Sequence, residues 1–307
     1  MATRPTRKSP SRATRTDGRT PLDVRPMQFL PGYLDHAEGS CLVTAGATRV
    51  LCAVSLEDRV PDFLVGKGRG WLTAEYAMLP RSTHTRSQRE STRGKIGGRT
   101  HEIQRLIGRS LRAVVDLEKL GERTLTVDCD VLQADGGTRT TAINGAYVAV
   151  AQAVAKLVDA GILAEMPLRE PVAAISVGIV GRELLVDLAY TEDSRAEVDA
   201  NFVMTGSGGI VEVQGTAEGR TFERRDLNRM LDAAWDAITH INRLQAKAIA
   251  SFAGATTTTG TAGAAKRGGG ASTGAKRRSG ASRGAERKGG TSRAKTAVKA
   301  KRARARR

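Results

Sequence analysis

The feature that most constrains this chain is the stretch 124–142, TLTVDCDVLQADGGTRTTA. Every second residue of 125–131 is apolar, and this period of two predicts a strand with one buried face. Gly136 and Gly137 follow, and the Ala- and Val-rich residues 142–157 have the spacing of a buried helix. The stretch therefore predicts a strand, a glycine turn and the start of a helix.

A glycine turn that leads into a helix can bind an anion. Glycines let backbone N–H groups converge, and the first turn of a helix leaves its N–H groups unpaired. Around Gly137, Thr138 and Thr140 could add hydroxyl donors, and Arg139 a planar fork that fits two phosphate oxygens. The alternative is a tight connection with a solvated arginine, because short glycine motifs also occur by chance.

The same residue types recur at Gly97-Gly98-Arg99-Thr100. The apolar residues that follow recur at spacings of three and four, which predicts a helix that ends at Gly121. Two arginines at two helix starts, Arg99 and Arg139, could clamp one phosphate. In the alternative interpretation Thr100 only caps its helix and Arg99 is a surface charge.

Charge divides the chain into three predicted parts. Residues 1–25 carry seven basic and two acidic residues, and residues 254–307 carry sixteen basic residues and one acidic residue. Because the net charge is +17, the body between them is slightly acidic. We therefore predict a basic flexible arm at 1–16, one globular domain at 17–253 and a disordered Lys/Arg/Gly/Ala-rich tail at 254–307.

The tail has almost no large apolar residue, so it cannot bury enough surface to fold. Its cations favour binding to RNA or DNA phosphates, and the alternative is a solubilising extension. A rival for the whole protein is a nucleic-acid-condensing protein in which the tail is the function.

Several classes of protein are disfavoured by composition. No run of about 18 apolar residues predicts a membrane span, and the N-terminus lacks the apolar centre of a secretory signal. The cysteines Cys41, Cys52 and Cys129 are odd in number and lack metal-ligand spacing. We expect reduced, mostly buried thiols, a cytoplasmic location and no membrane partner.

Two polar segments are candidates for ligand contacts. Residues 81–98 form a basic stretch, predicted as a mobile loop, whose Arg81, Arg86 and Arg89 could reach an RNA backbone. Residues 191–201 hold several carboxylates, which suit Mg²⁺ or one carboxyl kept protonated as an acid. Solvated loops of charged residues are the alternative for both. The remaining hairpin patterns and a long amphipathic helix from Leu227 predict an α+β fold.

Six stretches resemble the ribonuclease PH family, in the order expected for it. They are HAEGS at 36–40, WLTAEYAMLPRSTHTR at 71–86, GGRTHEIQRLIGRSLRAVVDL at 97–117, TVDCDVLQADGGTRT at 126–140, AISVGIV at 174–180 and VEVQGTAEG at 211–219. The resemblance implies a ribosomal protein S5 domain 2-like fold (the RNase PH domain), duplicated as two βαβ-type halves. It also implies a homo-hexameric ring, built as a trimer of dimers.

The implied reaction is phosphorolysis, in which inorganic phosphate as co-substrate releases nucleoside diphosphates from the 3′ end of tRNA precursors and other structured RNA. The resemblance assigns phosphate binding to Arg99, Gly137, Thr138 and Arg139. It assigns Mg²⁺ binding and acid catalysis to Asp193 and Asp199, and RNA contacts to Arg81, Arg86 and Arg89. An inactive RNA-binding ring subunit is the rival, and the presence of these arginines and aspartates argues against it.

The tail generates the first prediction. Deleting residues 254–307 should leave the rate at saturating RNA nearly unchanged and flatten the salt dependence of RNA binding. The reason is that each neutralised phosphate adds a slope of about 0.7–0.9 to log affinity against log salt. Binding of a structured RNA is measured at several salt concentrations for both chains. Equal slopes would show that the tail does not touch RNA.

Overall fold

The computed structural model describes residues 15–218 and 221–259, so most of the predicted arm and nearly all of the predicted tail lie outside the described residues. The described part is α+β with two sheets, as predicted. The first sheet has the order β1-β2-β3-β5-β4 and the second the order β7-β6-β8-β9. The strands are β1 (Met27–Pro31), β2 (Gly39–Ala45), β3 (Thr48–Glu57), β4 (Trp71–Met78), β5 (Thr124–Gln133), β6 (Val172–Val180), β7 (Glu183–Val186), β8 (Val198–Thr205) and β9 (Ile210–Ala217).

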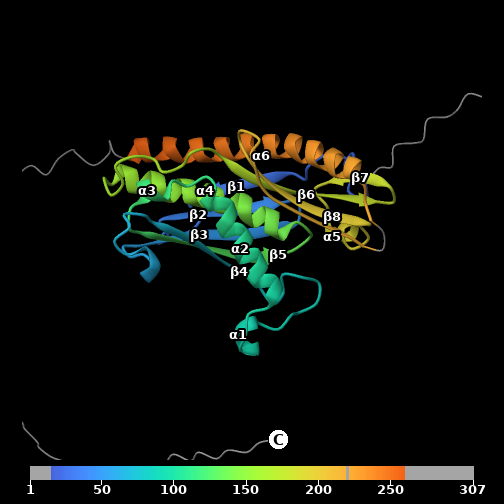
Figure 1. Cartoon of the computed structure of the whole chain (residues 1–307), viewed down its shortest axis with the longest axis horizontal. Coiled ribbons are helices and arrows are strands. Elements are labelled where there is room, and N and C mark those ends of the chain that lie inside the picture. The colour runs from blue at the N-terminus through green and yellow to red at the C-terminus, as the bar shows by residue number, and fades with distance from the viewer. Residues whose placement is uncertain (1–14, 219–220, 260–307) are drawn as a thin grey trace, which may run out of the picture. The chain divides into compact units, whose positions relative to one another are not determined.

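The helices connect and cover these sheets (Figure 1). They are η1 (Asp62–Leu64), α1 (Glu90–Arg93), α2 (Gly98–Arg112), α3 (Leu117–Leu120), α4 (Thr138–Asp159), α5 (Tyr190–Asp193) and α6 (Arg224–Thr259). In the first half β4 and β5 are parallel and joined through α2, which makes a βαβ unit. The described strands of the second sheet all pair antiparallel.

Helix α4 is the centre of the core. It packs on β2 and β3 of the first sheet and on β6 of the second, and most of its residues are buried. At Asn144 the buried side-chain amide donates to the carbonyl of Ala174 (2.9 Å) and accepts from its N–H (2.8 Å). The amide thus pairs with β6 as a neighbouring strand would, which fixes α4 against the second sheet.

Helix α6 lies over both halves, along β6 and β1 (Figure 1). Its buried Gln245 donates to the carbonyls of Asn144 (3.1 Å) and Val172 (3.2 Å). The sequence predicted an amphipathic helix here, and the observed helix continues to Thr259, into the first residues of the predicted tail.

Three element boundaries differ from the sequence predictions. The helix expected to end at Gly121 is two helices: α2 ends at Arg112, and the carboxylate of Asp116 caps α3. The chain turns between them because the Asp116 N–H donates to the carbonyl of Pro167 (2.6 Å), a tertiary contact. The basic stretch 81–98 contains the short helix α1, and α4 begins at Thr138 rather than near residue 142.

The structure bears on two expectations from the sequence: the state of the cysteines and the absence of a membrane span. Cys41, Cys52 and Cys129 are free and buried on adjacent strands, as predicted. Among the described residues, α4 is the one helix long and apolar enough to cross a membrane, and 83% of its most apolar window is buried inside the protein. That burial is typical of a core helix.

The tight packing of α4 generates the second prediction. A Cβ added at Gly145 would lie 2.4 Å from Cγ1 of Val43 and 2.9 Å from Sγ of Cys52. Gly145→Ala should therefore destabilise the protein by about 1–3 kcal/mol by overpacking, despite the better helix propensity of alanine. Urea unfolding measures the change. Gly98→Ala, where a Cβ meets nothing within 4 Å, is the control, and equal stability of both variants would contradict the packing argument.

Candidate active site

The glycine turn between β5 and α4 has the backbone that the sequence predicted. Gly136 (φ 74°) and Gly137 (φ 61°) are both left-handed, a conformation that strains other residues. A Cβ at Gly136 would lie 2.5 Å from the carbonyl oxygen of Leu188. Gly137 is the N-cap of α4, so the unpaired N–H groups of the first helical turn follow it directly.

Two side chains of this turn have different hydrogen-bonding roles. Thr138 Oγ1 accepts from the hydroxyl of Tyr76 (2.9 Å), which leaves its own proton available for a ligand. Burial raises the pKa of Tyr76, so this phenol remains a donor. Thr140 Oγ1 donates to the carbonyl of Gly137 (2.9 Å), so its hydroxyl stabilises the turn instead of serving as the anion donor that we predicted.

The two predicted phosphate-clamping arginines come from the first turns of α2 and α4. Arg99 is exposed on α2, whose start is fixed by Glu90: its Oε1 accepts from the N–H of Gly97 (3.3 Å) and from Thr100 Oγ1 (2.8 Å). Gly97 is therefore the N-cap, and the alternative role of Thr100 as cap is wrong.

Two hydrogen bonds hold one nitrogen of the Arg139 guanidinium. Its Nη1 donates to Oε1 of Glu102 (3.2 Å) and to Oε1 of Gln214 (3.0 Å). Glu102 lies on α2, three residues after Arg99, so this contact ties the first turns of α2 and α4 together. The remaining guanidinium N–H groups of Arg139 can then take part in a bidentate contact with an oxyanion.

The predicted carboxylates lie on separate elements. Asp193 ends α5, and Asp199 is the second residue of β8. Asn201 faces the same side as Asp199 because side chains alternate along a strand, and Ser176 is its partner on β6. Oδ1 of Asp199 is buried and has no hydrogen-bond partner among the described residues. A buried carboxylate oxygen without a partner is costly, which favours a proton or a cation there.

The pKa values of Asp193 and Asp199 also favour a proton or a cation at this position. Burial, reinforced by the negative charge of Asp193, raises the pKa of Asp199 to about 6, although Arg139 and Arg99 oppose the rise. Partial burial also raises the pKa of Asp193, again against the two arginines. Arg99 and Arg139 are therefore close enough to the two aspartates to shift the pKa values of their carboxyl groups.

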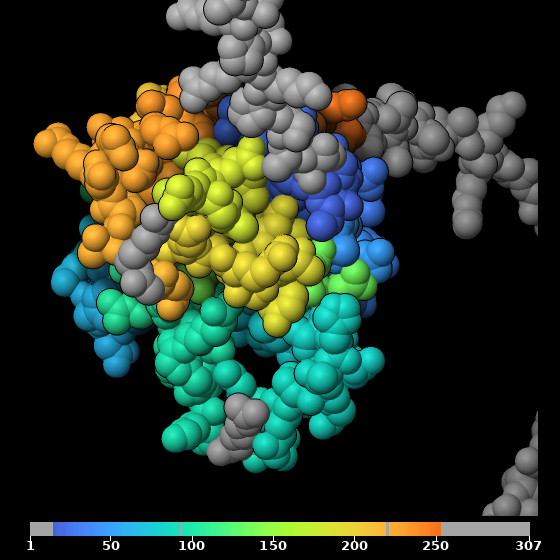
Figure 2. All heavy atoms as spheres, turned by 90° about the vertical axis from the view of Figure 1, so that its right-hand side faces the viewer, coloured from blue at the N-terminus to red at the C-terminus, as the bar shows by residue number. Residues whose placement is uncertain are grey.

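The two arginines, the glycine turn with Thr138 and the two aspartates line one cavity of about 600 Å³. Figure 2 shows this side of the molecule hollowed between the yellow surface of the second half and the teal surface of the first. The lining residues are Met78, Thr83, His84, Thr85, Arg99, Ala134, Gly136, Gly137, Thr138, Arg139, Ser176, Tyr190, Asp193, Asp199 and Asn201.

The cavity contains six of the nine predicted site residues: Arg99, Gly137, Thr138, Arg139, Asp193 and Asp199. The three predicted RNA contacts are exposed but do not line it. Arg81 donates to the carbonyl of His84, and Arg89 acts electrostatically on Asp130. The cavity is also lined by residues that were not predicted as site residues: Thr83, His84, Thr85, Ser176, Tyr190 and Asn201. Of these, the alternation from Asp199 could have indicated Asn201.

Comparison with known proteins identifies the family of this chain. Residues 23–156 match the model of the 3′ exoribonuclease family, domain 1, and residues 170–237 match domain 2 of the same family. The chain belongs to the 3′ exoribonuclease family. It is 56% identical over 239 residues to ribonuclease PH of Moorella thermoacetica, covering 78% of this chain and 96% of that protein. It is 60% identical over 221 residues to ribonuclease PH of Bacillus velezensis, covering 72% and 90%.

These relatives confirm the predicted family and the predicted class of enzyme, a phosphate-dependent exoribonuclease. Solved structures of the same fold include rice (Oryza sativa) Rrp46, with a TM-score of 0.62, 21% identity, and coverage of 76% of this chain and 100% of that one. Another is the Archaeoglobus fulgidus exosome with RNA bound to the active site, with a TM-score of 0.64, 23% identity, and coverage of 75% and 91%. At this identity they show the fold, which is the predicted one.

The carboxylate pair generates the third prediction. An unfolded Asp ionises near 3.8, whereas in the folded protein the pKa of Asp199 is about 6. Between these values the folded state binds the extra proton, so stability falls as the pH rises through this window. Asp199→Asn removes this penalty and should gain roughly 3 kcal/mol relative to the parent between about pH 3 and about pH 8.

Urea unfolding of both proteins across that pH range is the measurement. Asp159→Asn, at an exposed position at the end of α4, controls for the loss of an aspartate elsewhere. Parallel stability curves for the parent and Asp199→Asn would show that Asp199 ionises in the folded protein as it does in the unfolded chain.

Proposed function

We propose that the protein trims the 3′ end of tRNA precursors and other structured RNA by phosphorolysis; the RNA substrates follow from the family resemblance, and the geometry of the cavity supports the phosphate-dependent chemistry. The observation that carries this proposal is the meeting of two arginines, a helix N-terminus and a carboxylate pair in one cavity. Phosphate and the last phosphodiester are both anions, and a site that holds them together has to offset their repulsion.

The first half supplies the groups for phosphate. Arg99, Arg139 and the backbone N–H groups after Gly137 hold the phosphate in line with the phosphodiester phosphorus. Its dianion is already nucleophilic at neutral pH, so no general base is required. A phosphate oxygen bonds to phosphorus, the bond from phosphorus to the 3′ oxygen of the preceding nucleotide breaks, and that oxygen leaves as a hydroxyl after gaining a proton. The terminal nucleotide departs as a nucleoside diphosphate.

The second half supplies the groups for the leaving oxygen. Asp193 and Asp199 fit a Mg²⁺ site, because Mg²⁺ binds through one or two carboxylates plus substrate phosphate, and Oδ1 of Asp199 lacks a protein partner among the described residues. Bound Mg²⁺ would neutralise charge on the phosphodiester and the leaving oxygen. The alternative role of Asp199 is direct proton donation, for which a pKa of about 6 is suitable.

Three further parts of the proposal rest on the family resemblance and the exposed residues. Arg81, Arg86 and Arg89 contact the RNA backbone beside the cavity. Six subunits form a ring, as a trimer of dimers, which light scattering in solution tests. The enzyme works in the cytoplasm, a location that suits three unpaired cysteines.

The test of the function is the digestion of a transfer RNA with extra 3′ nucleotides, with and without inorganic phosphate. Diphosphates released only in the presence of phosphate support phosphorolysis. Release of monophosphates without phosphate would mean hydrolysis and would reject the proposal. Retention of this activity after removal of residues 260–307 would also separate the enzyme from a tail-driven condensing protein.

The fourth prediction concerns the phosphate clamp. Arg99→Ala and Arg139→Ala should each lower kcat/KM for phosphorolysis more than 100-fold. This corresponds to a loss of about 3 kcal/mol of transition-state stabilisation, the scale for losing one donor to a developing anion. Initial rates are measured as phosphate is varied. Arg169→Ala removes an arginine that is 60% exposed and paired with Asp116, and serves as the control. Near-normal rates in either clamp variant would reject the phosphate site.

The fifth prediction concerns the carboxylates. Asp193→Asn and Asp199→Asn should abolish turnover but spare RNA binding, because both act on the metal or the leaving oxygen. Asp128→Asn is the matched control: burial also raises the pKa of Asp128, yet it does not line the cavity. Rates are measured with Mg²⁺ titrated from zero. Survival of the rate and of its Mg²⁺ dependence in both variants would mean that these carboxylates are structural.

A further inference from the structure

Behind the cavity, the first described residues carry arginines that are buried instead of solvated. Arg15 is 7% exposed and Arg25 is 4% exposed. Arg15 falls at the end of the stretch predicted as a flexible arm. The N–H of Val186 donates to the carbonyl of Pro21 (2.8 Å), so this segment runs beside the end of β7. Burying an arginine is costly unless its charge is paired. The residues that pair with Arg15 and Arg25 therefore indicate what this segment does.

The partner of Arg25 is Asp187. This aspartate is 1% exposed and has a left-handed backbone (φ 57°), which is uncommon for a residue other than glycine. Its carboxylate accepts from Arg25 Nε (2.9 Å), Nη2 (2.7 Å) and backbone N (2.8 Å). The pair holds the pKa of Asp187 below its usual value in spite of burial. Asp187 opens the turn that leads from β7 into α5 and Asp193.

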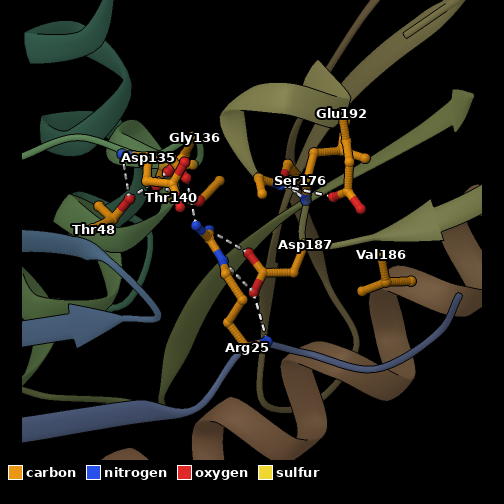
Figure 3. A network of polar contacts seen from close by, with 12 residues as sticks. Arg25, Thr48, Asp135, Gly136, Thr140, Ser176, Val186, Asp187 and Glu192 are labelled. Carbon is orange, nitrogen blue, oxygen red and sulfur yellow. Dashed lines mark hydrogen bonds and ion pairs between the residues drawn. The ribbon is translucent and has the colours of Figure 1, made fainter. Parts of the chain in front are cut away.

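Arg25 also contacts the glycine turn of the first half. Its Nη1 donates to the carbonyl of Asp135 (2.6 Å), and a Cβ on Gly137 would lie 2.8 Å from its Nη2. Figure 3 shows the guanidinium between the Asp187 carboxylate and the turn at Asp135 and Gly136. One rigid planar group therefore touches the phosphate turn and the carboxylate turn at once.

Arg15 holds the next part of the carboxylate turn. Its Nε donates to Oε1 of Glu192 (2.7 Å), and its Nη2 donates to Oε2 of the same residue. Two more of its bonds reach the carbonyls of Val186 (2.6 Å) and Asp187 (2.9 Å). Glu192 also accepts from the N–H of Ala189 (2.9 Å), which closes the first turn of α5. Glu192 directly precedes Asp193, so Arg15 fixes the helix that presents this carboxylate.

We propose that Arg25 and Arg15 are positioning residues that set the distance between the phosphate turn (135–139) and the carboxylate turn (187–193). This inference rests on the proposed function of those two turns. The turns belong to different halves of the chain, and about 50 residues of helix and strand separate them. The chain between the turns therefore does not set their spacing; contacts across the halves do, and Arg25 and Arg15 add to the packing of Gly136 against Leu188. The alternative is that the arginines only stabilise the fold.

The experiment compares Arg25→Lys with the parent enzyme. Lysine keeps the charge but cannot bond to the Asp187 carboxylate and the Asp135 carbonyl with a fixed planar fork. We expect kcat to fall by about 100-fold, the scale for a displacement of about 1 Å at a reacting centre. The KM for phosphate should stay close to that of the parent, because Arg99 and Arg139 remain in place and only the distance between the phosphate turn and the carboxylate turn changes.

Two further variants make the result decisive. Asp187→Asn keeps the side-chain shape and tolerates a left-handed backbone, so it breaks the same pair even if Arg25→Lys does not fold. Val114→Ala removes buried methyl groups just after α2, away from the cavity. It shows how a loss of stability alone changes the kinetics. Thermal unfolding, kcat and KM for phosphate are measured for each variant.

A fall in kcat with a near-parental KM for phosphate in Arg25→Lys or Asp187→Asn, but not in Val114→Ala, supports positioning. A kcat no lower than in Val114→Ala, or a KM for phosphate that rises as much as kcat falls, would overturn it and leave the proposed function intact. If the parent enzyme itself releases no diphosphates in the presence of phosphate, the proposed function fails and this inference fails with it.

Discussion

The site depends on one close approach, between the glycine turn of the first half and the start of α5 in the second. A Cβ on Gly136 would lie 2.5 Å from the carbonyl oxygen of Leu188 and 2.8 Å from the backbone N of Tyr190. No side chain fits there, and the positive φ of Gly136 adds a second reason for glycine. Because the backbones meet at this point, the N-terminus of α4 and the carboxylates after Tyr190 share one cavity.

Most of the fold could be predicted because its elements have strong local periodicity. The alternation before Gly136 and the apolar spacing of α2, α4 and α6 indicate buried faces directly. The end of α2 could not be predicted in this way. Apolar residues continue at helical spacing through Val115, but α2 ends at Arg112. The chain at 114–116 pairs instead with residues 167–169, far along the sequence. A tertiary contact of this kind leaves no local pattern.

The predictable part of the site lies in local motifs, and the rest depends on contacts between distant residues. Arg99, Arg139 and their glycines belong to motifs at helix starts, so residue type and position suffice to find them. Ser176 faces the cavity only through its register with Asn201, which no short motif encodes. Arg25 was counted among the charges of a basic N-terminal segment, and its burial depends on Asp187, 162 positions later in the sequence. Charge alone cannot distinguish a solvated arginine from a buried one.

The charges in the cavity would also link the two ligands proposed for it, phosphate and Mg²⁺. Burial and Asp193 raise the pKa of Asp199, whereas Arg139 and Arg99 lower it. Phosphate bound to the arginines would offset their positive charge and raise the pKa of Asp199 further. A divalent cation bound to the carboxylates would lower it, because a metal ion is the largest local charge in such a site. The two ligands act on the same carboxyl with opposite sign, so each reduces the electrostatic cost of binding the other. Phosphate without the cation would instead favour the protonated carboxyl, which is the form able to donate a proton to the leaving oxygen.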